Sequence, residues 1–251
     1  MKKIFIQLMV FSSLLLTSCS ADSDNVSKVT NYAVITIKGD NPFFLPLGQT
    51  YTDPGAVSTE GGAVIPTASA LTGGKYRGGT TLDVNKIDEY TENYSAVNKD
   101  GYKATKARKI IVYKTGDLVN SIEGVYTSTV KRNGVLMSAS QGSSVNMKYV
   151  YIWKNTDGTF GVSDAFGGWY DLGRSIGINS ATLGGKIAGD IPTNTFTFPG
   201  NPLTNKQFGG SANITGLTVD PATKTLVLTT VWEADAETTY TFVSTLTQVQ
   251  P

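Results

Sequence analysis

The sequence contains no histidine among its 251 residues. This absence excludes Ser-His-Asp and Cys-His catalysis as well as histidine-based zinc sites. It also removes the side chain best suited to proton transfer near neutral pH. A glycosidase-type pair of carboxylates is not favoured, because no two acidic residues are distinguished by their context. We therefore expect a protein that is not an enzyme and that uses neither a cofactor nor a metal ion.

The sequence also has a single cysteine and almost no net charge. Cys19 is the single cysteine, so no intramolecular disulfide can form. The 21 basic and 20 acidic residues nearly cancel, leaving a formal net charge of +1. Nucleic-acid-binding domains normally carry a clustered basic surface, which this balance does not suggest. We expect a fold stabilised by core packing alone and no nucleic-acid partner.

One apolar run stands at the N-terminus. Lys2 and Lys3 precede the run Ile4–Leu16, which only Gln7 and two serines interrupt. A membrane-spanning helix needs about 20 apolar residues, so this run is too short to be one. The pattern is typical of a signal peptide, which we place at residues 1–18.

The end of this run, Leu16-Thr17-Ser18-Cys19, resembles the lipobox of bacterial lipoproteins. The resemblance implies cleavage just before Cys19 and attachment of lipid to its thiol. An ordinary signal peptide followed by a chance cysteine is the alternative. The expected partner of the N-terminus is therefore the outer membrane, reached through the lipid.

The residues after Cys19 are polar and acidic, and they predict a flexible tether over residues 19–30. The stretch Ser20–Asn25 resembles the acidic signal of surface-exposed lipoproteins in Bacteroidetes-type bacteria. A plain solvated linker is the alternative interpretation. The resemblance implies an outer-membrane lipoprotein exposed at the cell surface.

The rest of the chain predicts an all-β fold. No segment shows a sustained 3.6-residue apolar period, and glycine, threonine, valine and tyrosine are frequent. Thr115–Asp117 forms a short junction between two patterns. We expect one domain over residues 31–115 and a second over residues 116–251.

The first domain contains a recognisable motif. Strands are predicted near Tyr32–Lys38, Glu89–Val97 and Tyr102–Tyr113, and prolines restrict Phe43–Leu47 to an edge strand. The stretch Gly48–Ala56 resembles the G-x-T/S-Y-x-D-P-G-A motif of a bacterial Ig-like family of cell-surface proteins. The motif's later parts are matched by Tyr90, Tyr94 and Arg108–Val112. The resemblance implies an Ig-like β-sandwich that serves as a spacer and presentation module.

The second domain predicts an antiparallel meander of about eight strands, arranged as a β-barrel or a sandwich. Asn133-Gly134 is a strong hairpin signal. In the strand Val145–Lys154, period-two alternation places Tyr149, Tyr151 and Trp153 on one face. The order of lipobox, Ig-like domain and β-domain resembles an uncharacterised Bacteroides-type lipoprotein family. That resemblance implies that the gene lies beside genes for nutrient-import machinery.

A glycine-flanked loop, Ser163–Asp171, is the most suggestive segment for ligand binding. It combines three aromatic residues with two carboxylates, a mixture that suits sugar rings and their hydroxyl groups. The candidate ligand-binding residues are Asp164, Phe166, Trp169, Tyr170 and Asp171, together with Trp153. The alternative is that Trp169 and Tyr170 fill the end of the domain, and that Trp153 and Trp232 also belong to a core.

These features predict a non-catalytic accessory lipoprotein that binds an oligosaccharide or another nutrient and delivers it to an importer. The alternative is a structural, adhesin-like spacer that binds another envelope protein. A calcium site at Asp157, Asp164 and Asp171 is not favoured, because their spacing matches no EF-hand loop.

Overall fold

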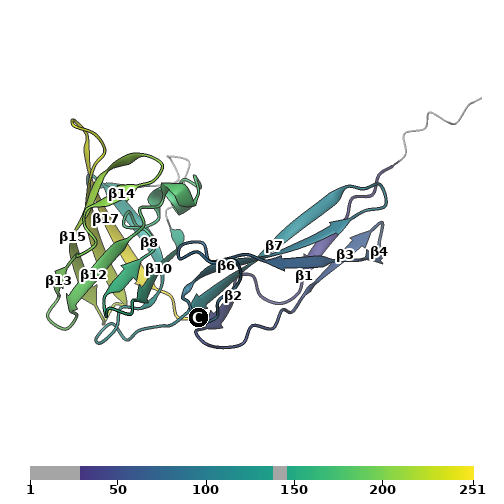
Figure 1. Cartoon of the computed structure of the whole chain (residues 1–251), viewed down its shortest axis with the longest axis horizontal. Coiled ribbons are helices and arrows are strands. Elements are labelled where there is room, and N and C mark those ends of the chain that lie inside the picture. The colour runs from purple at the N-terminus through teal and green to yellow at the C-terminus, as the bar shows by residue number, and fades with distance from the viewer. Residues whose placement is uncertain (1–28, 138–145) are drawn as a thin grey trace, which may run out of the picture.

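The computed structural model describes residues 29–137 and 146–251 and contains two β-rich domains, which confirms the all-β prediction (Figure 1). The strands of the N-terminal domain lie on the right of Figure 1 and the sheet of the C-terminal domain on the left. Residues 1–28, which include the predicted signal peptide, Cys19 and most of the tether, lie outside the described residues. Within the described ranges, no helix has the length and apolarity needed to cross a bilayer.

The N-terminal domain is a sandwich of two sheets. Its strands are β1 (Val34–Ile37), β2 (Phe43–Pro46), β3 (Ala56–Glu60), β4 (Ala63–Ile65), β5 (Ala68–Leu71), β6 (Asp88–Val97) and β7 (Lys103–Tyr113). One sheet has the order β1-β3-β4 and the other β2-β7-β6-β5. The proline-bounded strand β2 lies at an edge, as predicted, and runs parallel to β7. Ile35 from the first sheet packs with Tyr94 and Ala96 from the second, which joins the two layers.

The Ig-like motif residues meet in a polar cluster inside this sandwich. Arg108 is fully buried, and its Nη1 lies 2.5 Å from Asp53 Oδ1. Tyr94 donates a hydrogen bond to Asp53 Oδ1 at 2.5 Å, and Tyr51 donates one to Glu92 Oε2 at 2.5 Å. Burial opposes ionisation of Asp53, but hydrogen bonds from Tyr94 and Gly55 and the charge of Arg108 together lower its pKa. The motif therefore supplies an ion pair between the buried Arg108 and the partly exposed Asp53, together with its hydrogen-bond partners.

The C-terminal domain is one curled antiparallel sheet with two short helices. Its elements are β8 (Gly124–Arg132), β9 (Val135–Leu136), β10 (Met147–Lys154), β11 (Phe160–Val162), the π-helix η3 (Trp169–Gly173), the 3-10 helix η4 (Ile178–Ser180), β12 (Gly185–Asp190), β13 (Thr195–Thr197), β14 (Leu203–Asn205), β15 (Gly209–Asp220), β16 (Thr225–Glu233) and β17 (Thr239–Gln248). The order is β13-β12-β11-β10-β8-β17-β16-β15-β14, and β9 pairs with β8 across the predicted Asn133-Gly134 turn. The curl encloses a core on its inner face.

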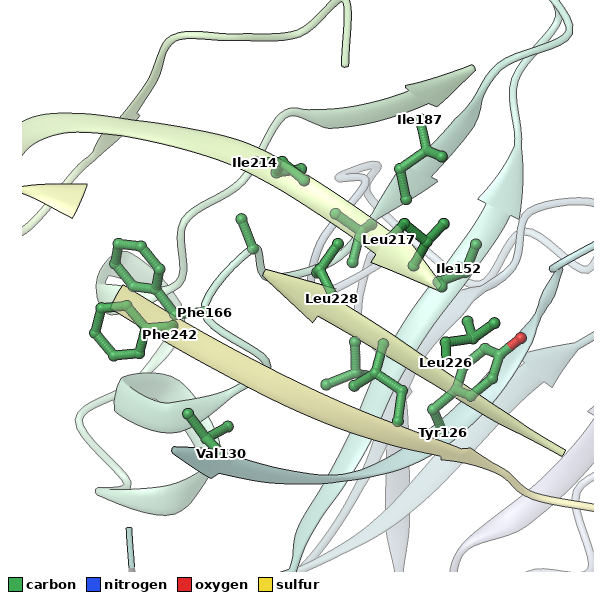
Figure 2. Packing of buried hydrophobic residues seen from close by; sticks show 14 of the residues in the cluster. Tyr126, Val130, Ile152, Phe166, Ile187, Ile214, Leu217, Leu226, Leu228 and Phe242 are labelled. Atoms are coloured by element: carbon green, nitrogen blue, oxygen red, sulfur yellow. The ribbon is translucent and has the colours of Figure 1, made fainter. Parts of the chain in front are cut away.

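That core is almost entirely aliphatic and aromatic. Figure 2 shows side chains from many strands directed toward one another, among them Ile152, Ile187 and Leu228. The rings of Phe166 and Phe242 stack at the left of this view, with centroids 4.4 Å apart. Burial of such side chains is the main stabilising contribution to a sheet of this kind.

Two asparagine side chains cover an open edge of β15. Asn201 accepts a hydrogen bond from Ile214 N at 3.0 Å and donates one to Ile214 O at 2.8 Å. Asn194 likewise accepts from Val219 N at 2.6 Å and donates to Val219 O at 3.2 Å. Each side-chain amide thus replaces a peptide unit of a neighbouring strand, which satisfies backbone groups beyond the short strand β14.

The predicted alternation along β10 is confirmed. Val150 and Ile152 are fully buried in the core of the C-terminal domain. Tyr149, Tyr151 and Trp153 point the other way and belong to a second cluster, which also contains Ile87 and Ile111 of the N-terminal domain. The outer face of β10 is therefore the surface on which the N-terminal domain packs, and it is not a solvated aromatic strip.

Candidate binding site

The segment Ser163–Asp171 is folded into the interior, which corrects its interpretation as an exposed ligand-binding loop. Asp164 and Trp169 are each 1% exposed and Phe166 is fully buried. Gly167 has a positive φ of 64°, and a Cβ at this position would collide with Ser244. The backbone therefore turns directly against β17, which drives the flanking aromatic rings into the core. The alternative interpretation, in which Trp169 and Tyr170 fill the end of the domain, agrees with their burial, since both belong to the core cluster and are 1% and 5% exposed.

Asp164 holds this segment together rather than facing a ligand. Its Oδ1 accepts hydrogen bonds from Phe166 N at 2.9 Å and Thr182 N at 3.0 Å. Burial, helped by the nearby charge of Asp171, raises the pKa of Asp164 to about 7 against the lowering effect of the backbone donors. Its Oδ2 is buried and has no hydrogen-bond partner among the described residues. Such an environment favours the neutral carboxyl group.

Asp171 and Trp153 lie at the contact with the N-terminal domain. Lys75 Nζ is 2.8 Å from Asp171 Oδ2, and the Tyr76 hydroxyl donates a hydrogen bond to the same oxygen at 2.8 Å. The Arg77 guanidinium lies over the Trp153 ring, 4.9 Å from its centroid. Both predicted ligand-binding residues are therefore used to join the two domains.

The same contact continues along β10. The Tyr151 hydroxyl donates a hydrogen bond to Glu89 Oε2 at 2.8 Å. Complete burial, together with the charge of Glu89, raises the pKa of Tyr151 well above its usual value. The rings of Phe44 and Tyr149 meet edge to face with centroids 5.8 Å apart. The interface therefore combines apolar packing with satisfied polar groups, as in stable protein interfaces.

Among the predicted ligand-binding residues, Tyr170 lines an open pocket in the described part of the chain. This pocket has a volume of about 300 Å³ and is lined by Tyr170, Arg174, Phe208, Trp232, Ala234, Asp235, Thr238 and Tyr240. The lining comes from η3, the β14–β15 loop and the β16–β17 hairpin. These three segments lie at the upper end of the C-terminal domain in Figure 1.

Four aromatic rings form the wall of this pocket. Trp232 and Tyr240 face each other as cross-strand partners of β16 and β17, with ring centroids 5.7 Å apart. Phe208 lies 5.0 Å from the Tyr170 ring and 6.3 Å from the Trp232 ring. Phe208 is 41% exposed, whereas Trp232 is 5% exposed. The pocket thus presents an apolar surface that solvent reaches, bounded by buried rings.

The local sequence explains how Phe208 is held at the rim. Asn205 is buried, and its Oδ1 accepts hydrogen bonds from Gln207 N and Phe208 N, which fixes the turn after β14. Gly209 and Gly210 follow with positive φ angles of 72° and 74°. Glycine tolerates these angles at no steric cost, so the chain reverses immediately after Phe208.

Polar groups flank the rings. Arg132 Nη1 donates a hydrogen bond to the Tyr170 hydroxyl at 3.3 Å, and the Arg132 guanidinium lies 4.9 Å from the Tyr240 centroid. Asp235 Oδ1 accepts a hydrogen bond from Glu237 N at 2.9 Å within the hairpin turn. Aromatic faces beside a small number of polar groups are characteristic of small-molecule binding sites.

Sequence reasoning missed most of this pocket. Phe208, Tyr240 and Arg174 were not among the candidate residues, and Trp232 was assigned to a core. One signal was available, because the strands on either side of Asp235 predict a hairpin that pairs Trp232 with Tyr240. No sequence signal brings Tyr170 and Phe208 to this hairpin, since they are close only in the folded chain.

The three aspartates considered for calcium lie in separate environments. Asp157 bonds to Thr159 and Lys186 on the surface, Asp164 is buried, and Asp171 pairs with Lys75. Among residues 29–137 and 146–251, no group of three or more histidine, cysteine, aspartate or glutamate side chains is arranged to hold a metal ion.

Two families of known proteins match the chain. Residues 35–112 match a family described as a bacterial surface protein, Ig-like domain. Residues 115–248, more than half of the chain, match a second family that is described as a C-terminal domain. The boundary between the two matches falls at the junction between β7 and β8.

One solved structure is similar over most of the chain. It is the crystal structure of the lipoprotein BT2262 from Bacteroides thetaiotaomicron, with 25% sequence identity and a TM-score of 0.60. The similarity covers 86% of this chain and 100% of that one. No curated protein matches this chain. The chain therefore belongs to the family that this C-terminal domain defines, and here the domain follows a bacterial surface Ig-like domain.

Proposed function

We propose that this protein is a non-catalytic accessory lipoprotein of the bacterial envelope that binds a glycan in the aromatic pocket of Tyr170, Phe208, Trp232 and Tyr240. The observation that carries the proposal is the exposed Phe208 ring beside three other rings at an open pocket. Sugar rings present apolar C–H faces that pack on aromatic rings, and their hydroxyl groups pair with neighbouring polar side chains.

Several features support the cellular setting of this proposal. The Ig-like family is one of surface proteins, and the similar crystal structure is that of a lipoprotein. The sequence Leu16–Cys19 supports lipid attachment at Cys19, and the acidic residues after it support exposure on the outer face of the outer membrane. An importer or another envelope protein is the proposed recipient of the glycan. The absence of histidine supports a binding role over catalysis.

Affinity electrophoresis of the purified protein in gels that contain single polysaccharides tests the proposal. We expect at least one glycan to retard the protein, and Phe208→Ala to abolish the retardation with only a small loss of thermal stability, since Phe208 is 41% exposed. The matched control is Tyr102→Ala, which removes an exposed aromatic ring from the N-terminal domain and should leave retardation unchanged. A folded protein that no glycan in a broad panel retards would contradict the proposal.

A structural spacer that binds another envelope protein is the second candidate. It is favoured by the use of Phe166, Trp169 and Trp153 in packing within and between the domains. Photo-crosslinking from position 208 in intact cells separates the two functions. A crosslink to one defined envelope protein that persists without any glycan would support the spacer, whereas protection of position 208 by a glycan would support the binding protein.

A further inference from the structure

We infer that the glycan bound in this pocket is acidic, and that Arg174 binds its carboxylate or sulfate group. This inference rests on the proposed function and specifies its ligand class. It depends on the charges around the pocket, which are independent of the aromatic rings that support glycan binding itself.

Arg174 lines the pocket, and its charged side chain has no partner among the described residues. Its backbone is fixed, because Arg174 N donates a hydrogen bond to Trp169 O at 2.9 Å at the end of η3. Its side chain is exposed, and in the described part of the chain it has neither an ion pair nor a side-chain hydrogen bond. A guanidinium held at the rim on a fixed backbone is thus available to a ligand.

The other charged groups in and beside the pocket already have partners within the protein. The carboxylate of Asp235 caps its own turn, and hydrogen bonds from Glu237 N and from Thr238 lower its pKa. Arg132 is stacked on Tyr240 and bonded to the Tyr170 hydroxyl. The exposed acids of the same hairpin, Glu233 and Glu237, do not line the pocket. Arg174 and Asp235 are the charged residues that line the pocket, and of the two only Arg174 has no side-chain partner among the described residues, so its guanidinium is free to bind an anionic group beside the rings.

This arrangement suits one kind of ligand particularly well. A guanidinium donates two parallel hydrogen bonds to a carboxylate or a sulfate, and such charge-assisted bonds are stronger than neutral ones. A uronic acid or a sulfated sugar carries such a group on a ring whose C–H face packs on an aromatic side chain. The pocket wall of Phe208 and Tyr240 would hold the ring while Arg174 binds the charged group.

The test compares acidic polysaccharides with neutral ones. Polygalacturonate, alginate, hyaluronan and chondroitin sulfate are each placed in native gels, beside neutral glucans, galactans and mannans. Each carboxylated polymer is paired with its carboxyl-reduced form, which keeps the glycosidic linkages and removes the charge. We expect retardation by at least one acidic polymer and a dissociation constant about tenfold weaker for its reduced form.

Two variants locate the effect at Arg174. Arg174→Gln should weaken binding of the acidic polymer about tenfold and leave any binding of the reduced form unchanged. Arg174→Lys should recover part of the affinity, because it keeps the charge but not the paired donors. The control Lys206→Gln removes the same charge from the neighbouring loop, outside the pocket lining, and should have little effect.

The possible failures are distinguishable. Binding of neutral glycans alone, or equal loss of affinity in the Arg174 and Lys206 variants, would overturn the acidic-ligand inference and leave glycan binding intact. Binding of no polymer from either group would overturn both the inference and the proposed function.

Discussion

The two domains bury ionisable groups in opposite ways. In the N-terminal domain, Arg108 is fully buried but meets Asp53 and Tyr51 at hydrogen-bonding distance, and its guanidinium lies over the Tyr94 ring, 5.5 Å from its centroid. In the C-terminal domain, Asp164 is buried with backbone donors on one oxygen and no partner on the other. The first arrangement keeps its groups charged through pairing, whereas the second favours neutralisation. Whether a buried ionisable group stays charged therefore depends on the partners that surround it.

Removal of Arg108 should have the largest effect. Arg108→Met leaves Asp53 and Glu92 without their cation, and we expect the N-terminal domain to lose about 4 kcal/mol of stability. All three tryptophans lie in the C-terminal domain, but Trp153 contacts Arg77 of the N-terminal domain. In a Trp153→Phe background, the fluorescence of Trp169 and Trp232 follows the core of the C-terminal domain alone. Far-UV circular dichroism should therefore show an early unfolding transition that tryptophan fluorescence does not.

The control for Arg108→Met is Lys103→Met, which alters an exposed cation on the same strand. Loss of stability in both variants to the same extent, or a change confined to tryptophan fluorescence, would contradict the assignment of Arg108 as the centre of the polar cluster.

Replacing Asp164 by a neutral residue should remove a pH dependence of the free energy of unfolding of the C-terminal domain. Its pKa, raised from 3.8 to about 7, means that the folded chain keeps a proton that the unfolded chain releases. The free energy of unfolding therefore falls as the pH rises from about 4 to about 7 and is constant above that. Asp164→Asn keeps the Oδ1 acceptor, so we expect equal stability at low pH and a gain of about 4 kcal/mol above neutrality.

Urea unfolding followed by tryptophan fluorescence at several pH values checks this prediction. A constant difference between Asp164→Asn and the parent protein across that range would show that Asp164 does not titrate in the folded state. Arg108→Met serves as the comparison, because its destabilising effect on the N-terminal domain, followed by far-UV circular dichroism, should persist from pH 5 to 9.

The ion pair between the domains should contribute less than either buried group. Asp171 is almost completely buried and Lys75 is partly exposed. A double-mutant cycle with Asp171→Asn and Lys75→Met should give a coupling free energy of about 1 kcal/mol. Denaturation followed by tryptophan fluorescence supplies the four values, and a coupling of zero would show that this ion pair does not stabilise the contact between the domains.

The smallest effect is expected on the surface of the C-terminal domain. Lys186 and Asp157 form an ion pair at 3.1 Å in which both side chains are largely exposed. Solvent screens such pairs, so Lys186→Met should leave the denaturation midpoint unchanged. A shift as large as that of Asp171→Asn would remove the distinction between buried and exposed pairs on which this comparison depends.

Much of the fold could be predicted, because strand periodicity and turn residues are local signals. The alternation in β10 and the hairpin at Asn133-Gly134 follow from spacing alone. The helix η3 was missed, since its five residues are too few to show a period and Gly167 and Gly168 suggested an exposed loop. The use of η3 in the core depends on Ser128 and Ser244, which lie far away in the sequence.

The candidate site was predicted less well for a related reason. Aromatic residues mark both cores and binding surfaces, and the sequence does not reveal which face of β10 the N-terminal domain covers. The roles of Trp153 and Asp171 depend on their contacts with Arg77 and Lys75, which only the folded chain brings beside them. No sequence signal distinguishes Arg174 from other arginines, because its role depends on the lack of a side-chain partner, which only the folded structure shows.

The asparagines along β15 have a consequence for hydrogen exchange. The amide hydrogens of Ile214 and Val219 are bonded to Asn201 and Asn194 side chains rather than to another strand. Their exchange with deuterium therefore requires only a change of side-chain rotamer, while amides between β16 and β17 require two strands to separate. These two positions should exchange as isolated fast sites within an otherwise slowly exchanging sheet.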